Sequence, residues 1–170
     1  MHEKQENKWD VKAGTYHFED QLESVKYLDR FFKMEKFLLL YYNYGWMREY
    51  LSDLILNFNK INITVKPIFF TPKFTGKCEE NYLVILIRTK ENGNNAEKLV
   101  EKKSEVKIGT NCYHLTINTK YILMVATNAE GLKLGIKEFN FLFNYLGEYI
   151  EKLHKLDNIK ISGVKIYNCK

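Results

Sequence analysis

Histidine and cysteine are the first residue types to consider for chemistry in this chain. His114 lies on the polar side of an alternating segment, where an imidazole could serve as a general acid or base near neutral pH. Cys112 could act as a nucleophile, although no catalytic signature surrounds it. His154 lies close to Lys152 and Lys155, where we expect the last turn of a helix and a favourable interaction with its dipole. His154 therefore suits capping and Cys112 a small semi-buried thiol, while His114 stays a weak acid–base candidate.

A cluster of aromatic residues is the best candidate for ligand contact. It consists of Tyr41, Tyr42, Tyr44 and Trp46, beside a predicted turn at residues 43–45. Aromatic rings next to a turn can stack on sugars or on nucleic-acid bases. The same rings can instead form the core at a strand-to-helix junction, which is the reading we favour. We keep the four residues as possible ligand contacts.

The sequence indicates neither a cofactor nor a metal site. Cys78, Cys112 and Cys169 are odd in number, widely spaced and without a CxxC pair, which argues against a disulfide framework and a zinc knuckle. Gly131 and Gly135 lack the lysine and third glycine of the phosphate-binding fingerprints. We therefore expect no catalytic, cofactor or metal residue, and a reducing location, the cytoplasm.

Composition indicates one globular domain. The chain has 170 residues, of which 45% are hydrophobic and 28% charged, so it can bury a sizeable core. Its net charge of +5 comes from lysines interleaved with glutamates, which permits nucleic-acid binding without requiring it. The polar start is unlike a signal peptide, and the longest apolar run falls short of the ~18 residues that span a bilayer. We expect no membrane association.

A strand followed by a long helix organises the chain. Residues 121–126 are apolar throughout, which predicts a strand covered on both faces. Thr127 and Glu130 fit a capping box at the start of a helix over about 128–155. The core-facing stripe of this helix is Leu132, Ile136, Phe139, Phe143, Leu146, Ile150 and Leu153. Gly131 and Gly135 would let the helix backbone approach the strands closely.

Three further apolar residues of this helix lie nearly opposite the stripe, namely Leu134, Phe141 and Tyr145. A helix with two apolar faces must have both covered. Cover by an N-terminal helix and an interface with another subunit or a partner are equally good explanations.

The remaining elements complete an α+β layout. Helical spacing predicts an N-terminal helix at about 18–34 and an amphipathic helix at about 46–59. Strands are predicted at 37–42, 61–66, 82–87, 113–117 and 159–166, with a hairpin at 118–120. The fold class is therefore α+β, a mixed sheet of about five to six strands with helices packed on it. Residues 1–35 form an N-terminal arm and helix, and residues 36–170 a single α+β domain.

Residues 112–146 resemble a known family. The matching residues are Tyr113-His114-Leu115-Thr116-Ile117, Ile122, Ala126, Gly131-Leu132-Lys133-Leu134-Gly135-Ile136, Phe139 and Leu142. This pattern resembles the small α+β domain that precedes the catalytic barrel in family 20 β-hexosaminidases and related glycoside hydrolases. The resemblance implies a hairpin, a helix with Gly-x-x-x-Gly and a final strand. Because the sequence stops at Lys170, we expect no barrel and none of the paired carboxylates of glycoside hydrolysis.

We therefore predict a non-catalytic, stand-alone accessory or interaction module that self-associates. Its partner would be another copy of the chain or a different protein, with carbohydrate as a further possibility. The alternative is a nucleic-acid-binding α+β domain that uses its basic surface and exposed aromatic rings. A small hydrolase using His114 comes third, so we expect no enzyme.

Overall fold

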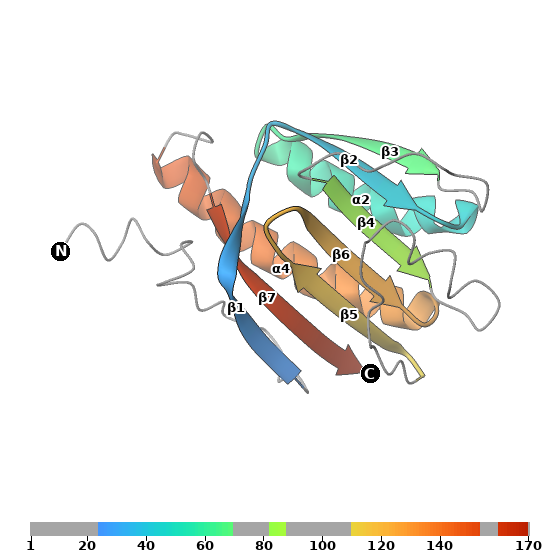
Figure 1. Ribbon diagram of the computed structural model, residues 1–170. Coiled ribbons are helices and arrows are strands. Elements are labelled where there is room, and N and C mark those ends of the chain that lie inside the picture. The colour runs from blue at the N-terminus through green and yellow to red at the C-terminus, as the bar shows by residue number, and fades with distance from the viewer. Residues whose placement is uncertain (1–23, 70–81, 88–109, 154–159, 170) are drawn as a thin grey trace.

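The computed structural model describes residues 24–69, 82–87, 110–153 and 160–169, with side chains of the last helix described up to Leu142 (Figure 1). Its strands are β1 (Ser24–Lys33), β2 (Phe37–Tyr42), β3 (Thr64–Phe69), β4 (Tyr82–Ile87), β5 (Cys112–Ile117), β6 (Tyr121–Ala126) and β7 (Lys160–Cys169). Its helices are the short η2 (Gly45–Met47), α2 (Arg48–Lys60) and α4 (Ala129–Leu153). The predicted helices at about 46–59 and 128–155 are confirmed.

All described strands join one mixed sheet. Its seven strands follow the order β1-β7-β5-β6-β4-β2-β3, so the prediction of five to six strands is slightly low. Strands β6, β4, β2 and β3 pair in parallel, while β5, β7 and β1 continue the sheet in antiparallel pairs. The predicted hairpin joins β5 to β6, and Asn118 Oδ1 accepts hydrogen bonds from the backbone N–H groups of Lys120 and Tyr121 at 2.9 Å. The α+β fold class is confirmed.

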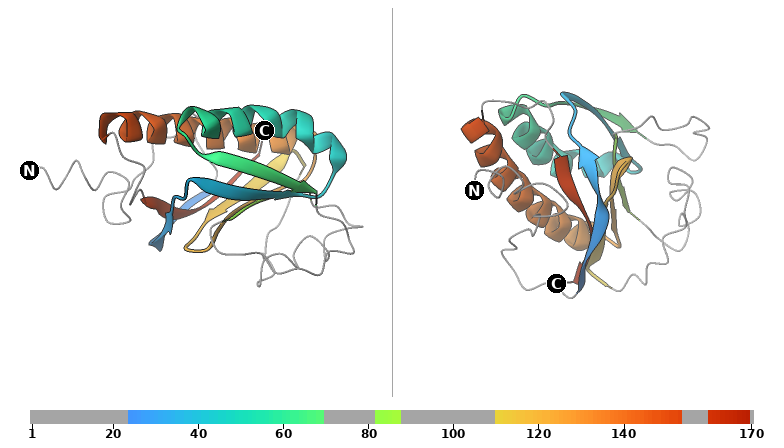
Figure 2. Two further views of the ribbon diagram at one scale, coloured as in Figure 1. Left: turned by 90° about the horizontal axis from the view of Figure 1, so that it is seen from above. Right: turned by 60° about the vertical axis from the view of Figure 1, so that its left-hand side comes forward.

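Both helices cover the same face of the sheet (Figure 2, left). Their apolar stripes enter one large core cluster, in which Leu51, Leu54, Leu132 and Phe139 are almost fully buried. The opposite face holds a second buried cluster of Tyr41, Tyr82, Val84, Leu86, Leu123 and Val125. The central strands are thus buried on both sides, as the unbroken apolar run at 121–126 predicts.

The predicted N-terminal helix at 18–34 is wrong over the residues that the structure describes. Residues 24–33 form β1, an edge strand in which Phe32 lies opposite Ile161 of β7. The pairing register with β7 shifts between Tyr27 and Phe31. Because of this irregularity, apolar residues at helical spacing can still lie along one strand that pairs with β7. Aromatic and β-branched residues suit such a strand, and the tertiary pairing with β7 overrides the local pattern. Residues 1–23 lie outside the described residues.

The start of α4 differs in detail from the predicted capping box. Asn128, rather than Thr127, caps the helix, because its Oδ1 accepts a hydrogen bond from Gly131 N at 2.9 Å. The Thr127 hydroxyl instead accepts a hydrogen bond from Cys112 N at 3.0 Å, and Thr127 N donates to Cys112 O at 3.1 Å. The Glu130 carboxylate accepts a hydrogen bond from Lys133 Nζ at 3.2 Å. Thr127 therefore ties the helix start to β5, one residue before the cap.

The close approach of α4 to the sheet is confirmed. A Cβ on Gly131 would collide with the carbonyl oxygen of Cys112, and a Cβ on Gly135 would lie 2.8 Å from Met124 Sδ. Both positions therefore require glycine for packing rather than for a left-handed backbone.

A disulfide joins Cys112 and Cys169. These residues are directly opposite each other on β5 and β7, so the prediction that the cysteines form no disulfide is wrong for this pair. Sequence spacing could not show the pairing, because 57 residues separate the two cysteines. Among the described helices, none is long and apolar enough to cross a membrane.

Candidate functional site

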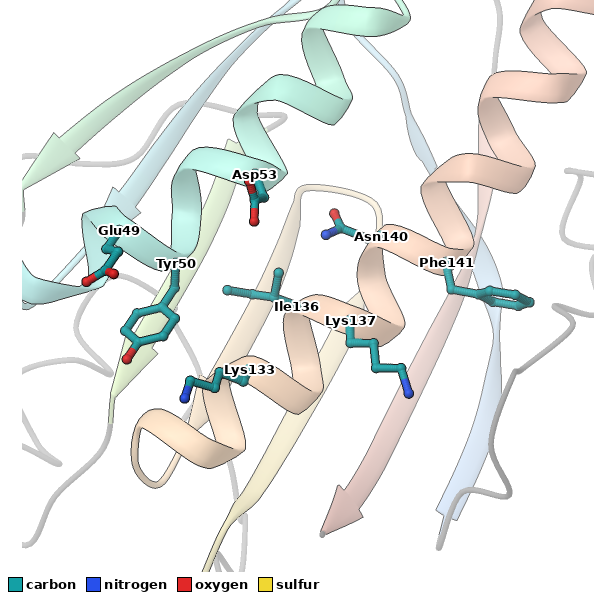
Figure 3. A pocket seen from close by; sticks show the side chains of 8 residues that line it. All are labelled: Glu49, Tyr50, Asp53, Lys133, Ile136, Lys137, Asn140 and Phe141. Atoms are coloured by element: carbon teal, nitrogen blue, oxygen red, sulfur yellow. The ribbon is translucent and has the colours of Figure 1, made fainter.

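An open groove of about 570 Å³ runs between α2 and α4 on the outer side of the helix layer (Figure 3). Its lining residues are Glu49, Tyr50, Asp53, Lys133, Ile136, Lys137, Asn140 and Phe141. The two helices lie side by side because each is anchored to the sheet by its own apolar stripe. Phe58 and Phe139 meet beneath the groove, with ring centroids 6.0 Å apart.

The two walls of the groove carry opposite charges. Glu49 and Asp53, one helical turn apart, are exposed on α2, and Lys133 and Lys137 are exposed on α4. Lys133 Nζ lies 3.2 Å from Glu130 Oε1. This hydrogen bond and the charge of Glu130 raise the pKa of Lys133, with smaller contributions from Tyr50 and Glu49. Lys133 therefore keeps its positive charge well above neutral pH.

Asn140 adds a polar group to the wall formed by α4. Its Oδ1 is buried and has no hydrogen-bond partner within the described part of the chain. In Figure 3 the amide extends from α4 toward α2 and Asp53. A buried acceptor without a donor costs free energy, so this carbonyl is available to a donor that enters the groove.

The aromatic candidates separate into two groups. Tyr41 and Tyr42 are each only 4% exposed and belong to the core clusters on opposite faces of the sheet. Trp46 is 43% exposed and stacks on Tyr44, with ring centroids 6.1 Å apart. It also meets Tyr50 edge-on at 5.7 Å. Trp46 thus contacts Tyr50 of the groove lining and Tyr44 stacks on Trp46, whereas Tyr41 and Tyr42 are core residues.

Tyr50 connects this aromatic group to the charged walls. Lys133 Nζ lies 5.5 Å from the centroid of the Tyr50 ring, a distance that permits a cation–π interaction. Three rings and one ammonium group therefore follow one another along the N-terminal ends of α2 and α4.

The acid–base and nucleophile candidates lie elsewhere. His114 is half-buried on the side of β5 away from the helices and contacts the Tyr167 ring in a tilted arrangement, with ring centroids 4.5 Å apart. The Cys112 sulfur is bonded to Cys169, so Cys112 is not a free thiol. His154 lies outside the described residues. The structure therefore does not bring His114 together with the groove.

The interface candidates are only partly described. Leu134 is half-buried and packs against the large core cluster. Phe141 is half-buried, lines the groove and points away from α2 in Figure 3. The side chain of Tyr145 lies outside the described residues. Phe141 is therefore the candidate that reaches the outer surface of the helix layer.

Sequence reasoning missed most of the groove. An acidic pair four residues apart on α2 and a lysine pair four residues apart on α4 were visible in the sequence. Nothing in the sequence showed that the two helices are neighbours. Among the described residues, no group of three or more histidine, cysteine or acidic side chains could hold a metal ion.

Comparison with known proteins finds similarity in fold only. No family model and no curated protein matches the sequence. CpGH84D superimposes with a TM-score of 0.59 at 10% identity, over 91% of this chain and 24% of its own length. The beta-N-acetylhexosaminidase from Bacteroides fragilis NCTC 9343 gives a TM-score of 0.54 at 9% identity, over 89% and 24%.

A third structure, the GH20 beta-N-acetylhexosaminidase from Streptomyces coelicolor A3(2), gives a TM-score of 0.47 at 13% identity, over 86% of this chain and 25% of its own length. The chain thus spans about a quarter of the length of the structures it resembles. The resemblance to a small α+β domain of a larger glycoside hydrolase is confirmed at the level of fold. This chain superimposes on a part that makes up about a quarter of each of these structures.

Proposed function

We propose that this protein is a non-catalytic interaction module that self-associates through the outer surface of α2 and α4. The observation that carries the proposal is the groove between these helices, which has two charged walls and includes Phe141 in its lining. Leu56 is 57% exposed on α2, and Phe141 is half-buried on α4. A surface that combines exposed apolar side chains with charges suits a protein interface.

The fold comparison supports a role as one domain among several. About nine-tenths of this chain aligns with the similar structures, and the aligned part makes up about a quarter of each of them. Because fold alone does not determine function, the comparison carries no reaction over to this chain.

Replacing Phe141 with glutamate tests this proposal. We expect the oligomeric mass of the full chain, measured by light scattering, to fall while the melting temperature changes little. The matched control is Phe37→Glu, because Phe37 is 53% exposed at the start of β2. An unchanged mass for Phe141→Glu, or a collapse of the fold, would contradict the proposal.

Carbohydrate binding is a second candidate, favoured by the exposure of Trp46 next to Tyr44 and Tyr50. An exposed indole can stack on a sugar ring, and nearby carboxylate and amide groups can bond its hydroxyls. A glycan array with wild type and Trp46→Ala tests this candidate. Binding that survives the substitution, or no binding at all, would remove it.

Nucleic-acid binding is the alternative favoured by the β1–β7 edge. Lys26 lies opposite Lys165 and Lys33 opposite Lys160, and like charges in such positions are unfavourable without an anionic partner. Lys160 Nζ also lies 4.4 Å from the centroid of the Phe31 ring. Mobility shift across a range of salt concentrations tests this candidate, since phosphate contacts weaken steeply with ionic strength.

The cytoplasmic location predicted from the cysteine count stays a proposal. The Cys112–Cys169 disulfide argues against it, because disulfides persist mainly in oxidising compartments. Alkylation of protein taken directly from its source cells, followed by mass spectrometry, distinguishes the oxidised from the reduced pair.

A further inference from the structure

The outer surfaces of α2 and α4 carry matching ridges of opposite charge. On α2, Glu49, Asp53 and Leu56 are exposed at positions i, i+4 and i+7. On α4, Lys133 and Lys137 are exposed and Phe141 is half-buried, at positions i, i+4 and i+8. Residues with these spacings share one helix face. Each ridge thus has two charges of one sign at its N-terminal end and an apolar side chain beyond them.

The two ridges run in the same direction and at the same height. α2 follows β2 and α4 follows β6, and these strands belong to the parallel part of the sheet. The contact between Lys133 and the Tyr50 ring places the first turns of the helices level with each other. The acidic pair of α2 is therefore level with the lysine pair of α4 along the helix axes, although the Lys137 side chain points away from α2 (Figure 3).

We propose that the partner of this surface is a second copy of the chain, related by a twofold axis that runs along the groove, parallel to both helices. This inference rests on the proposed self-association and specifies its geometry. Such a rotation lays α2 of one copy over α4 of the other. It leaves the direction of each helix and the position of each residue along the axis unchanged. Glu49 then faces Lys133 of the second copy, Asp53 faces Lys137, and Leu56 lies near Phe141. A twofold axis makes each of these contacts twice.

The charge pattern selects this axis over the alternative. A twofold axis across the helices would lay α2 on α2 and α4 on α4, so the acidic pair and the lysine pair would not meet. Complementary charges contribute to register and specificity more than to affinity. Affinity would come mainly from the burial of Leu56 and Phe141 and of the groove surface between the two copies.

A charge exchange tests the geometry directly. One variant carries Glu49→Lys and Asp53→Lys, and the other carries Lys133→Glu and Lys137→Glu. By sedimentation of the full chain, we expect wild type to be dimeric and each variant alone to dissociate about 100-fold more readily, since like charges would face each other twice. An equimolar mixture of the two variants should form a heterodimer with near-wild-type affinity. The four substitutions in one chain should restore the homodimer.

The matched control for Lys133→Glu with Lys137→Glu is Lys26→Glu with Lys165→Glu, which makes the same change in net charge on the opposite side of the sheet. It should leave the dimer unchanged. If a reversal lowers the melting temperature, the neutral pair Glu49→Gln and Asp53→Asn replaces it, with an expected rise in Kd of about 10-fold.

The outcomes separate the two levels of the proposal. A dimer that is lost with Phe141→Glu but unaffected by the charge reversals would overturn the twofold geometry and leave self-association standing. Failure of the two variants to form a heterodimer would overturn the geometry as well. A wild-type chain that stays monomeric at every concentration would overturn both.

Discussion

Gly131→Ala is the sharpest test of how α4 is held against the sheet. The added Cβ would collide with the carbonyl oxygen of Cys112 and lie 3.0 Å from both the carbonyl carbon and the nitrogen of the same residue. This backbone cannot easily move, because Thr127 bonds both its N–H and its C=O and the disulfide fixes its side chain. The collision is therefore with rigid backbone, which is the costly case.

The expected magnitude follows from two opposing effects. Overpacking costs about 1–3 kcal/mol, occasionally more, and a backbone obstacle places Gly131 at or above the top of that range. Alanine recovers up to about 1 kcal/mol of helix propensity. We expect the free energy of unfolding to fall by about 2 kcal/mol, or the melting temperature by about 4–8 °C for a chain of this size.

Urea denaturation of three alanine variants measures this effect with internal controls. At Gly135 the added Cβ would meet Met124 Sδ, the end of a flexible side chain, at 2.8 Å and the Tyr113 ring at 3.0 Å, so we expect a smaller loss. At Gly45 nothing lies within 4 Å, so Gly45→Ala should be close to neutral. If Gly131→Ala were as stable as wild type, or less harmful than Gly135→Ala, the close approach of α4 to β5 would be refuted.

Three further predictions concern the same framework. Asn43→Ala should lower the free energy of unfolding by about 2 kcal/mol, because the Asn43 side chain donates to Ile87 O at 2.8 Å and accepts from Ile87 N at 2.9 Å, at the end of β4. Asn43→Asp keeps the acceptor and should lose less. Equal losses in the two variants would contradict this account. Asn128→Ala should lower the free energy of unfolding, measured by chemical denaturation, by about 1 kcal/mol, because the α4 cap is lost. If this variant kept full stability while Thr127→Val frayed α4, Thr127 would be the cap, as the sequence predicts. Reduction of Cys112–Cys169 should lower the free energy of unfolding by about 2–4 kcal/mol, and identical urea curves with and without reductant would show that no disulfide forms.

Local patterns predicted the elements that depend on local physics. The periodic apolar stripe gave the position of α4, and the amphipathic spacing at 46–59 gave α2. The unbroken apolar run at 121–126 predicted a strand buried on both faces, because no face of it could remain in water. The pair Gly131 and Gly135 predicted close packing, because glycine in a helix is unfavourable without such a reason.

The misassigned N-terminal segment shows where local patterns fail. Residues 24–33 carry apolar side chains at helical spacing, yet they form β1 because β7, some 130 residues later, offers an edge to pair with. A shift in register absorbs the mismatch between the helical spacing and the strand. The cap of α4 moved from Thr127 to Asn128 for a related reason: β5 binds the Thr127 hydroxyl.

The sequence by itself determined the α+β class, the two helices, the central strands and the glycines that bring α4 close to the sheet, because each depends on residues near one another in the chain. Only the tertiary structure decided which distant residues meet. It placed Cys112 opposite Cys169, buried Tyr41 and Tyr42 while leaving Trp46 exposed, and set the acidic ridge of α2 beside the lysine ridge of α4. These outcomes follow from strand order and helix direction, which are set by the burial of the whole core and leave no mark in any single stretch of sequence.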